Sequence, residues 1–309
     1  IPAAVSITTQ GETLTLADRS GEPLRPFLVW LDSRAENEAQ ALRSVLDNET
    51  FYKTTGLPEV TGALPLAKLL WLRKHEPDTF SRAHKLLLLE DYLLHWLTGR
   101  FVSEKSLQTS TGWFDLHSDG LWHSGLAAAG ASAELLPELL ECGVPAGSLL
   151  PGPAAELGLP PNIPVVAGAM DQTAAALAAG CTRPGTVTET TGTALVMAAC
   201  TDAPMFRSGH HVTVYRHALP DKYLYLPIGN TAGMALRWFR DEFCRDLPAG
   251  AAGYAALDAL VQSVPCGCDG LAFLPFLSGS VDPDACPEAR AVFFGARLST
   301  TRAHFARSV

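Results

Sequence analysis

The sequence is poor in charged residues, and its longest apolar run is too short to cross a membrane. Charged residues make up 18 % of the 309 residues, against roughly 25 % in an average soluble chain. Lysines and arginines number 23 and acidic residues 32, a net charge of −9, and such a surface repels nucleic-acid backbones. The most apolar stretch, residues 86–97, contains Glu90 and Asp91 and falls short of the roughly 20 residues that span a bilayer. We therefore expect neither a nucleic-acid nor a membrane partner.

The cysteines and histidines suit neither a disulfide framework nor a metal cluster. The seven cysteines are odd in number and scattered, and only Cys266 and Cys268 lie close together. No second pair completes a zinc motif. His210 and His211 are adjacent, but neighbouring residues of a strand point to opposite faces, so shared metal ligation is not expected. We expect free thiols and a cytoplasmic protein.

The length and the hydrophobic content allow two domains. With 47 % hydrophobic residues, the chain can build a core in each of two domains of roughly 100–200 residues. Apolar runs near Val5 and over residues 27–31 predict strands, whereas the patterns over 35–46, 65–71 and 87–97 predict helices. Residues 143–164 contain six prolines and predict a loop.

The second half of the chain opens on a strand, a glycine turn and a helix. Residues 164–168 predict the strand, and the helix of small residues over 172–179 ends at Gly180. Two further strands, 186–190 and 194–199, are joined by Thr191-Gly192-Thr193. We place a domain boundary between Gly180 and Pro184, which gives domains 1–180 and 184–309. Later elements are a helix after Gly233, a buried strand over 272–277 and a helix capped by Thr300 or Thr301.

Both ends of the chain read as interior sequence. The chain begins with Ile1 and passes at once into a strand pattern, and the last helix has run barely two turns at Val309. We therefore expect an internal segment of a longer protein.

Three segments together carry a resemblance to a known family. Residues 64–75 contain Lys68 and Trp71 at the spacing of an N-terminal signature, and residues 291–309 follow a C-terminal signature. Gly168-Ala169-Met170-Asp171-Gln172 is followed by Thr191-Gly192-Thr193 at the family's spacing. In these features, which cover essentially the whole chain, the sequence resembles the FGGY carbohydrate kinases, the family of glycerol kinase and xylulokinase, although Leu64 and Ala296 depart from the signatures. The resemblance implies an α/β fold of two actin-like (ribonuclease H-like) domains that flank a cleft, both incomplete here. It also implies a sugar or polyol bound mostly by the first domain and ATP mostly by the second.

Asp171 is the candidate catalytic residue. Phosphoryl transfer to an alcohol requires a base aimed at the acceptor hydroxyl and a metal ion that spreads the phosphate charge. The resemblance implies that Asp171 is this base and a ligand of Mg²⁺, and we expect the helix N-terminus to keep it ionised. Its local sequence fits a helix N-cap equally well.

The candidate nucleotide-binding residues are Thr191, Gly192, Thr193, Gly233 and Arg237. Thr193 stands 22 positions after Asp171, which is the family's spacing for a phosphate-binding hairpin, where glycine lets backbone approach phosphate. An ordinary hairpin turn is the alternative. Gly233 and Arg237 match positions that contact ATP in glycerol kinase, although Arg237 replaces a glutamine there; a turn and an exposed helix residue are the alternatives. The cofactors implied are ATP and Mg²⁺.

The candidate acceptor-binding residues are Glu12, Trp30, Asp32 and Gln172. Glu12 can accept hydrogen bonds from two hydroxyls, and Gln172 offers a donor and an acceptor. Trp30 and Asp32 fit an apolar face and a polar anchor of a sugar pocket, or else a core tryptophan and a turn aspartate. Gly11 stands where the family has Arg or His, and the tyrosine that lines the glycerol site is absent near Thr61, so the residues secure neither glycerol nor xylulose.

The favoured function is ATP-dependent phosphorylation of a small sugar or polyol, with a ketopentose such as xylulose first among the acceptors. The alternatives are a non-catalytic sugar-binding or regulatory fragment, glycerol kinase-like specificity, or an actin-like ATPase that acts on a protein. The family's Asp-x-Gly-Thr phosphate loop and its glycine-rich adenosine site are missing from this sequence, so we expect little or no turnover from the chain alone. Besides the substrate, a homodimer partner is expected.

Overall fold

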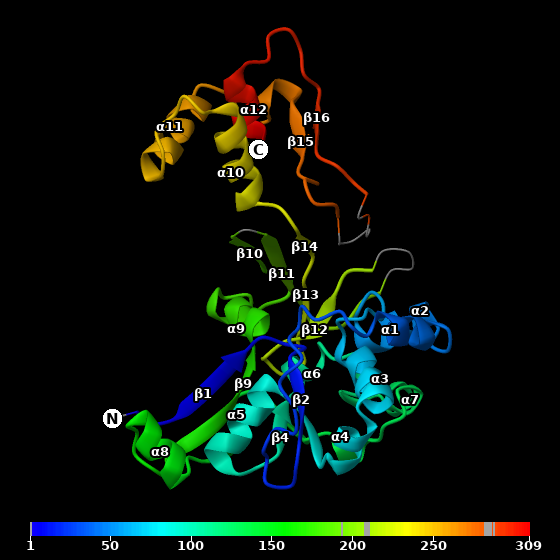
Figure 1. Cartoon of the computed structure of the whole chain (residues 1–309). Helices are drawn as coiled ribbons and strands as arrows, with labels where there is room; N and C mark the ends of the chain where they lie inside the picture. The colour runs from blue at the N-terminus through cyan, green and yellow to red at the C-terminus, as the bar shows by residue number, and fades with distance from the viewer. Residues whose placement is uncertain (1, 193, 207–210, 281–285, 287) are drawn as a thin grey trace. The chain divides into compact units, whose positions relative to one another are not determined.

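The computed structural model describes the chain except residues 1, 193, 207–210, 281–285 and 287. Helices and strands alternate along it (Figure 1), so the predicted α/β class is confirmed. The chain divides into two compact units. The first comprises Ile1–Thr188 and Ala198–Leu226, and the second comprises Glu189–Met197 and Pro227–Val309. The predicted boundary between residues 180 and 184 stays a prediction.

A three-stranded sheet in the first unit sets the geometry of the candidate site. Its order is β1 (Val5–Thr9), β9 (Pro164–Met170) and β8 (Pro145–Ser148). β1 and β9 are parallel, with Thr9 opposite Met170. A Cβ atom added to Gly168 would meet the carbonyl oxygen of Ile7 at 1.6 Å, so glycine is required where the two strands approach. The carboxyl ends of both strands therefore lie at the same edge.

Helices cover this sheet and continue it. α5 (Leu89–Thr98) packs against β1, β8 and β9 and buries Leu94 and Leu97. α9 (Asp171–Ala178) begins directly where β9 ends. The strand-to-helix junction predicted at Asp171 is confirmed.

The main core of the first unit surrounds a buried strand pair and helix α3. β2 (Leu14–Ala17) pairs antiparallel with β3 (Lys85–Leu88). α3 (Pro65–His75) starts at a proline, which suits the first turn of a helix because its missing N–H has no helical partner there. Seven of its residues are buried, so helix α3 is enclosed on most sides. The largest buried side chains of this core include Leu14, Leu16, Phe51, Leu66, Leu69 and Trp113.

The remaining elements of the first unit are short. The helices are α1 (Glu36–Arg43), α2 (Asn48–Thr55), α4 (Pro77–Arg82), α6 (Lys105–Gln108), α7 (His123–Ala128) and α8 (Pro151–Leu157), with a 3₁₀ turn at Ala133–Leu135. The strands are β4 (Val102–Glu104), parallel to β7 (Glu138–Leu140), and β5 (Phe114–Asp115), antiparallel to β6 (Gly120–Leu121).

A ring of ion pairs joins a later segment of the chain to the first unit. Lys105 Nζ lies 2.5 Å from Asp119 Oδ2 and 2.6 Å from Glu141 Oε1. Arg216 contacts the same two carboxylates at 2.5 and 2.8 Å. Arg216 ends β12 (Val214–Arg216), which pairs with β13 (Tyr223–Tyr225). The ring explains why these strands pack with the first unit although they follow β10 in the sequence.

The second unit is smaller. β10 (Val187–Thr191) lies beside β11 (Leu195–Thr201), and of these two strands only residues within 189–197 belong to the second unit. The first two residues of β11 pair with β14 (Ile228–Gly229). The helices that follow are α10 (Gly233–Phe243), α11 (Ala251–Val261) and α12 (Arg302–Ser308), with a 3₁₀ turn at Cys268–Gly270. β15 (Ala272–Leu274) pairs antiparallel with β16 (Val292–Phe294). Thr301 caps α12, as predicted.

Four predicted elements are wrong in part. Residues 27–31 form no strand, and only Leu28 makes an isolated bridge, to Leu14. The beginning of the helix predicted over 87–97 is the end of β3, because these residues pair with β2. The predicted loop over 143–164 contains β8 and α8. The strand predicted over 272–277 ends at Leu274, whose side chain is 45 % exposed rather than buried.

In the part of the chain that the structure describes, every helix is too short or too polar to traverse a lipid bilayer.

Candidate active site

Three of the predicted site residues follow the parallel strands β1 and β9. Gln10, Gly11 and Glu12 come directly after β1, and Asp171 and Gln172 come directly after β9. Parallel strands present their carboxyl ends at one edge of a sheet, where α/β folds bind ligands. Burial raises the pKa of Glu12, and the charge of Asp171 adds a smaller contribution in the same direction. The structure therefore places Glu12 and Asp171 at the same edge of the sheet.

Asp171 is the first residue of α9, and Met170 occupies the N-cap position. The Asp171 side chain is half-buried, and its Oδ1 accepts a hydrogen bond from the backbone N–H of Gln172 at 2.6 Å. Burial raises the pKa of Asp171 and outweighs this hydrogen bond, which lowers it. That the helix N-terminus keeps Asp171 ionised stays a prediction. A raised pKa suits a carboxylate that must accept a proton near neutral pH.

Glu12 has an uncommon backbone conformation and an unusual ionisation. Its φ angle is 64°, in the left-handed region that non-glycine residues rarely occupy. Burial raises the pKa of Glu12 to about 7, although the nearby charge of Lys68 lowers it. Strained residues of this kind are found at ligand-binding sites more often than elsewhere.

Lys68 is a member of this site that the sequence analysis noted only as part of a signature. Its side chain, on α3, is fully buried. Its Nζ donates hydrogen bonds to the carbonyl oxygens of Val29 at 2.8 Å and of Glu12 at 3.3 Å. Burial lowers the pKa of Lys68 to about 8, and Glu12 and Asp32 offset part of this shift. The sequence feature that could have pointed to Lys68 is a charged residue within an apolar run, between Leu66-Ala67 and Leu69-Leu70.

Trp30 lies beside the turn that carries Glu12. The Trp30 N–H donates to the Thr13 hydroxyl oxygen at 3.0 Å, and Gln10 Nε2 donates to the same oxygen at 2.8 Å. Trp30 is 45 % exposed. The alternative of a core tryptophan is therefore excluded, and an apolar surface remains beside Glu12.

Asp32 is already paired with a neighbouring side chain. Arg34 Nε donates to its two oxygens at 3.0 and 2.9 Å, and these hydrogen bonds lower the pKa of Asp32. The Arg34 guanidinium in turn lies over the Trp71 ring, 5.0 Å from its centre. Asp32 is therefore an anchored, ionised carboxylate near Lys68.

Gly11 faces a tightly packed wall. A Cβ atom at this position would meet Ser110 Oγ at 2.6 Å and Met170 Sδ at 3.3 Å. A larger side chain would therefore require Ser110 to move. Gln172, which follows Asp171, is half-buried.

Two predicted nucleotide-binding glycines lie together in the second unit. The Gly233 N–H donates to the Gly192 carbonyl oxygen at 2.9 Å, and a Cβ atom at Gly233 would meet that oxygen at 2.4 Å. The Gly192 N–H donates to Ala194 O at 2.9 Å, and the Thr191 hydroxyl donates to Glu189 Oε1 at 2.5 Å. Thr193 lies outside the described residues. Gly233 is the first residue of α10, and its close packing fits a plain turn as well as a nucleotide contact.

Arg237 is an exposed residue of α10. Its side chain is 71 % exposed and its Nε lies 3.6 Å from Asp241 Oδ2. The contacts of Arg237 thus fit its alternative, an exposed helix residue, as well as a nucleotide contact.

Comparison with known proteins identifies the family. Residues 1–178 match the N-terminal domain and residues 187–309 the C-terminal domain of the FGGY family of carbohydrate kinases. The chain belongs to this family. Gluconokinase of Bacillus subtilis (strain 168) is 28 % identical to it over 98 % of this chain and 60 % of the relative. Xylulose kinase of Escherichia coli (strain K12) is 31 % identical over 94 % of this chain and 58 % of the relative.

The solved structures agree with this family and with the expected actin-like α/β fold. A xylulose kinase from Rhodospirillum rubrum superposes with a TM-score of 0.89 at 33 % identity, over 100 % of this chain and 61 % of that one. A gluconate kinase from Lactobacillus acidophilus superposes with a TM-score of 0.85 at 24 % identity, over 99 % of this chain and 61 % of that one. The FGGY chain thus spans about three-fifths of the length of these relatives.

The FGGY chain has no preformed metal centre among its described residues. None of these residues form a group of three or more His, Cys, Asp or Glu side chains that could hold an ion. Magnesium is commonly held by one or two carboxylates together with phosphate oxygens and water. The single carboxylate of Asp171 therefore fits Mg²⁺ that arrives with a nucleotide.

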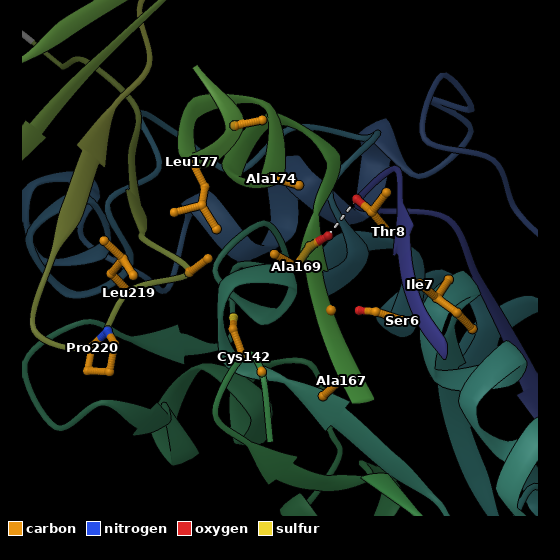
Figure 2. Close-up of a pocket in the computed structure, with 14 residues that line it drawn as sticks. Ser6, Ile7, Thr8, Cys142, Ala167, Ala169, Ala174, Leu177, Leu219 and Pro220 are labelled. Carbon is orange, nitrogen blue, oxygen red and sulfur yellow. Dashed lines mark hydrogen bonds between the residues drawn. The ribbon is translucent and has the colours of Figure 1, made fainter. Parts of the chain in front are cut away.

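The first unit also has a pocket of about 570 Å³ (Figure 2). It is lined mainly by small apolar side chains from β1, β9 and α9. Thr8 Oγ1 donates to Ala169 O at 2.7 Å, and Cys142 Sγ donates to Glu104 Oε2 at 2.8 Å. Burial raises the pKa of Cys142, so its thiol is not activated. None of the predicted site residues lines this pocket.

Proposed function

We propose that this chain carries the acceptor site and part of the nucleotide site of an ATP-dependent carbohydrate kinase. The observation that supports it most is the position of Asp171 and Glu12 directly after the carboxyl ends of two paired parallel strands. Asp171 accepts the proton of an acceptor hydroxyl. The hydroxyl oxygen forms a bond to the γ-phosphorus of ATP, the bond from that phosphorus to the bridging oxygen breaks, and ADP leaves.

The residues around Asp171 bind and orient the acceptor in this proposal. Glu12 accepts hydrogen bonds from sugar hydroxyls, and Gln172 both donates and accepts them. The exposed Trp30 ring faces the C–H side of the sugar, and Asp32 offers an ionised carboxylate. Holding the acceptor in one orientation turns a bimolecular encounter into a reaction within a complex.

The nucleotide side uses the glycine pair of the second unit. Gly192 and Gly233 allow backbone to approach phosphate, with Thr191, Thr193 and Arg237 as further contacts. Thr191 and Gly192 would exchange their present partners, Glu189 and Ala194, for phosphate oxygens. Mg²⁺ held by Asp171 and phosphate oxygens would neutralise part of the phosphate charge.

A ketopentose such as xylulose is the favoured acceptor. Relatives at 28–31 % identity are named for gluconate, xylulose and autoinducer-2, and the R. rubrum structure is a xylulose kinase. Gly11 puts no large polar side chain on the acceptor wall, where Ser110 and Met170 pack against it instead. Glycerol kinase-like specificity is the alternative. A homodimer and a cytoplasmic location also stay predictions.

Titration calorimetry tests this function. D-xylulose, D-gluconate, glycerol and a nonhydrolysable ATP analogue are each titrated into the chain, and we expect D-xylulose and the analogue to bind. Glu12→Gln should weaken sugar binding about tenfold or more, whereas the exposed Glu59→Gln should not. Sugar binding without nucleotide binding would favour the non-catalytic alternative. Nucleotide binding without any sugar or polyol would favour an ATPase that acts on a protein.

Turnover is the second test. Losing one preorganised transition-state donor costs about 3–4 kcal/mol, and the phosphate loop that the family resemblance leads us to expect is not in this sequence. We therefore expect almost no ADP release from this chain in a coupled assay. Ordinary kinase rates from the chain would contradict this expectation.

A further inference from the structure

Lys68 lies beneath the proposed acceptor site and has none of the roles assigned above. Lysine is almost never fully buried unless it is paired. Among the described residues, no carboxylate lies within ion-pair distance of Lys68. Its hydrogen-bond acceptors are instead the main-chain carbonyl groups of Val29 and Glu12, at 2.8 and 3.3 Å. The ammonium group thus contacts backbone on both sides of the site.

The two segments that Lys68 contacts have little regular structure of their own. Residues 10–13 turn between β1 and β2, and residues 29–32 follow the single bridge at Leu28. The hydroxyl of Thr13 links them through Trp30 N and Gln10 Nε2. The left-handed backbone of Glu12 persists only if its surroundings hold it in place. These segments carry Glu12, Trp30 and Asp32.

We propose that Lys68 is a positioning residue of the acceptor site: its ammonium group ties the Glu12 turn to the segment that carries Trp30 and Asp32. The proposal rests on the proposed function of these residues. An apolar side chain would fill this place in α3 without the cost of burying a charge, so packing alone does not account for a lysine. The charge of Lys68 also favours the ionised form of Glu12.

Lys85 provides a matched control. Its Nζ also donates to two main-chain carbonyl oxygens, of Glu134 at 2.7 Å and of Leu136 at 2.8 Å. It stands on β3 and contacts neither segment of the acceptor site through these bonds. Lys85→Met therefore removes the same kind of tie at another place in the first unit.

Hydrogen exchange of the full chain, read by mass spectrometry, tests the tie directly. In Lys68→Met we expect residues 10–13 and 29–32 to exchange about tenfold faster or more, since hydrogen bonds from a charged donor are lost. In Lys85→Met we expect faster exchange only around residues 134–136. Unchanged exchange in the two segments of Lys68→Met, or equal loosening in Lys85→Met, would overturn the proposal. If Lys68→Met does not fold, Lys68→Arg is measured instead, because it keeps the charge and the hydrogen-bond donors. Slow exchange of residues 10–13 and 29–32 in Lys68→Arg would support the proposal. Fast exchange of these residues in a folded Lys68→Arg chain would contradict it.

A titration separates positioning from a merely structural role. The groups that face this part of the site are Glu12, Asp32, Arg34 and Asp171. The titration of Glu12 is followed by the NMR signal of its carboxyl carbon. Its midpoint should lie at a higher pH in Lys68→Met than in the wild-type chain, and it should be the same in Lys85→Met as in the wild-type chain. An unmoved midpoint in Lys68→Met would count against the proposal. The affinity for D-xylulose should fall about tenfold in Lys68→Met alone. Absence of xylulose binding in the wild-type chain would count against the proposed function, whereas the exchange result decides the role of Lys68.

Discussion

The two compact units of the chain differ in how deeply they bury their side chains. The first unit encloses Lys68 and the carboxylates of Glu90, Asp91 and Glu104 completely. In the second unit, the apolar side chains of one sheet face remain exposed; these are Leu274 at 45 %, Val292 at 46 % and Phe294 at 72 %. Charged groups can be fixed in place only where a thick core surrounds them. The proposed acceptor residues therefore lie in the unit that buries charged side chains more deeply.

The buried carboxylates show how the first unit uses this depth. Glu104 Oε1 accepts hydrogen bonds from Leu107 N at 2.5 Å and Met170 N at 3.0 Å. Glu90 Oε1 accepts one from Gly168 N at 3.1 Å. Gly168 and Met170 are the residues of β9 that lead to Asp171. Two buried acids thus fix the backbone directly before the proposed base.

Deleting a large core side chain in each unit should show the largest effects. Trp113 is fully buried and its Nε1 donates to Gln108 Oε1 at 2.7 Å, so Trp113→Ala should lower the free energy of unfolding by about 3–5 kcal/mol. Phe239 is buried in a smaller cluster, beside Phe243 at 52 % exposed. Phe239→Ala should therefore cost less, because its surroundings can collapse. Urea unfolding followed by circular dichroism measures the free energy of unfolding of both variants. A larger decrease in Phe239→Ala than in Trp113→Ala would contradict the deeper packing of the first unit.

The pH dependence of stability should come from the first unit. Burial raises the pKa of Asp91 from 3.8 to about 7, and it raises the pKa of Glu90 and Glu104 as well. The folded chain keeps protons that the unfolded chain has released, so stability falls as pH rises from about 4 to about 7. Asp91 alone contributes on the order of 4 kcal/mol to this loss.

Asp91→Asn tests whether stability falls, rather than rises, with increasing pH. Urea unfolding between pH 5 and 8 should show a shallower loss in this variant than in the wild-type chain, and the exposed Asp78→Asn should keep the wild-type slope. Stability that rises with pH over this range, or a slope that Asp91→Asn leaves intact, would show that the buried acids are ionised in the folded chain.

The packing of the nucleotide side can be tested with two glycines. Gly233→Ala should lower the free energy of unfolding by about 1–3 kcal/mol, because its Cβ atom would meet Gly192 O at 2.4 Å. Gly192→Ala meets no atom within 4 Å and should cost far less. Thermal unfolding compares the two variants. An equal decrease in stability in the two variants would mean that the backbone around Gly192 moves to accommodate the added Cβ atom of residue 233, and that the two glycines are not tightly packed.

Arg237→Ala should have the smallest effect. The side chain is 71 % exposed and its ion pair with Asp241 is long, so the free energy of unfolding should change by less than about 0.5 kcal/mol. If Arg237 contacts phosphate, the same variant should bind an ATP analogue more weakly in calorimetry. Unchanged nucleotide affinity would remove Arg237 from the proposed site.

Much of the second half of the chain could be predicted from local pattern. The junction of β9 and α9, the hairpin around Gly192 and the cap at Thr301 follow from glycine turns and capping residues, which act over a few positions. Strand β3 could not be predicted, because its partner β2 lies some 70 residues away and a leucine run alone fits helix or strand.

The candidate site could be predicted only in part, because some of its features are local in sequence and others depend on tertiary structure. Asp171 and Glu12 stand out by type and by family spacing, but the sequence cannot show that β1 and β9 are parallel neighbours. Lys68 was missed as a site residue because its importance lies in two carbonyl contacts made by tertiary structure. The raised pKa of Asp171 could not be predicted either, because it comes from burial, which local sequence does not report.

A crystal structure of the chain with D-xylulose tests the central claim most directly. We predict a sugar hydroxyl within hydrogen-bond distance of the Asp171 carboxylate, with a second hydroxyl on Glu12. Xylulose in the Cys142 pocket, or anywhere that leaves Asp171 without a sugar contact, would contradict the account.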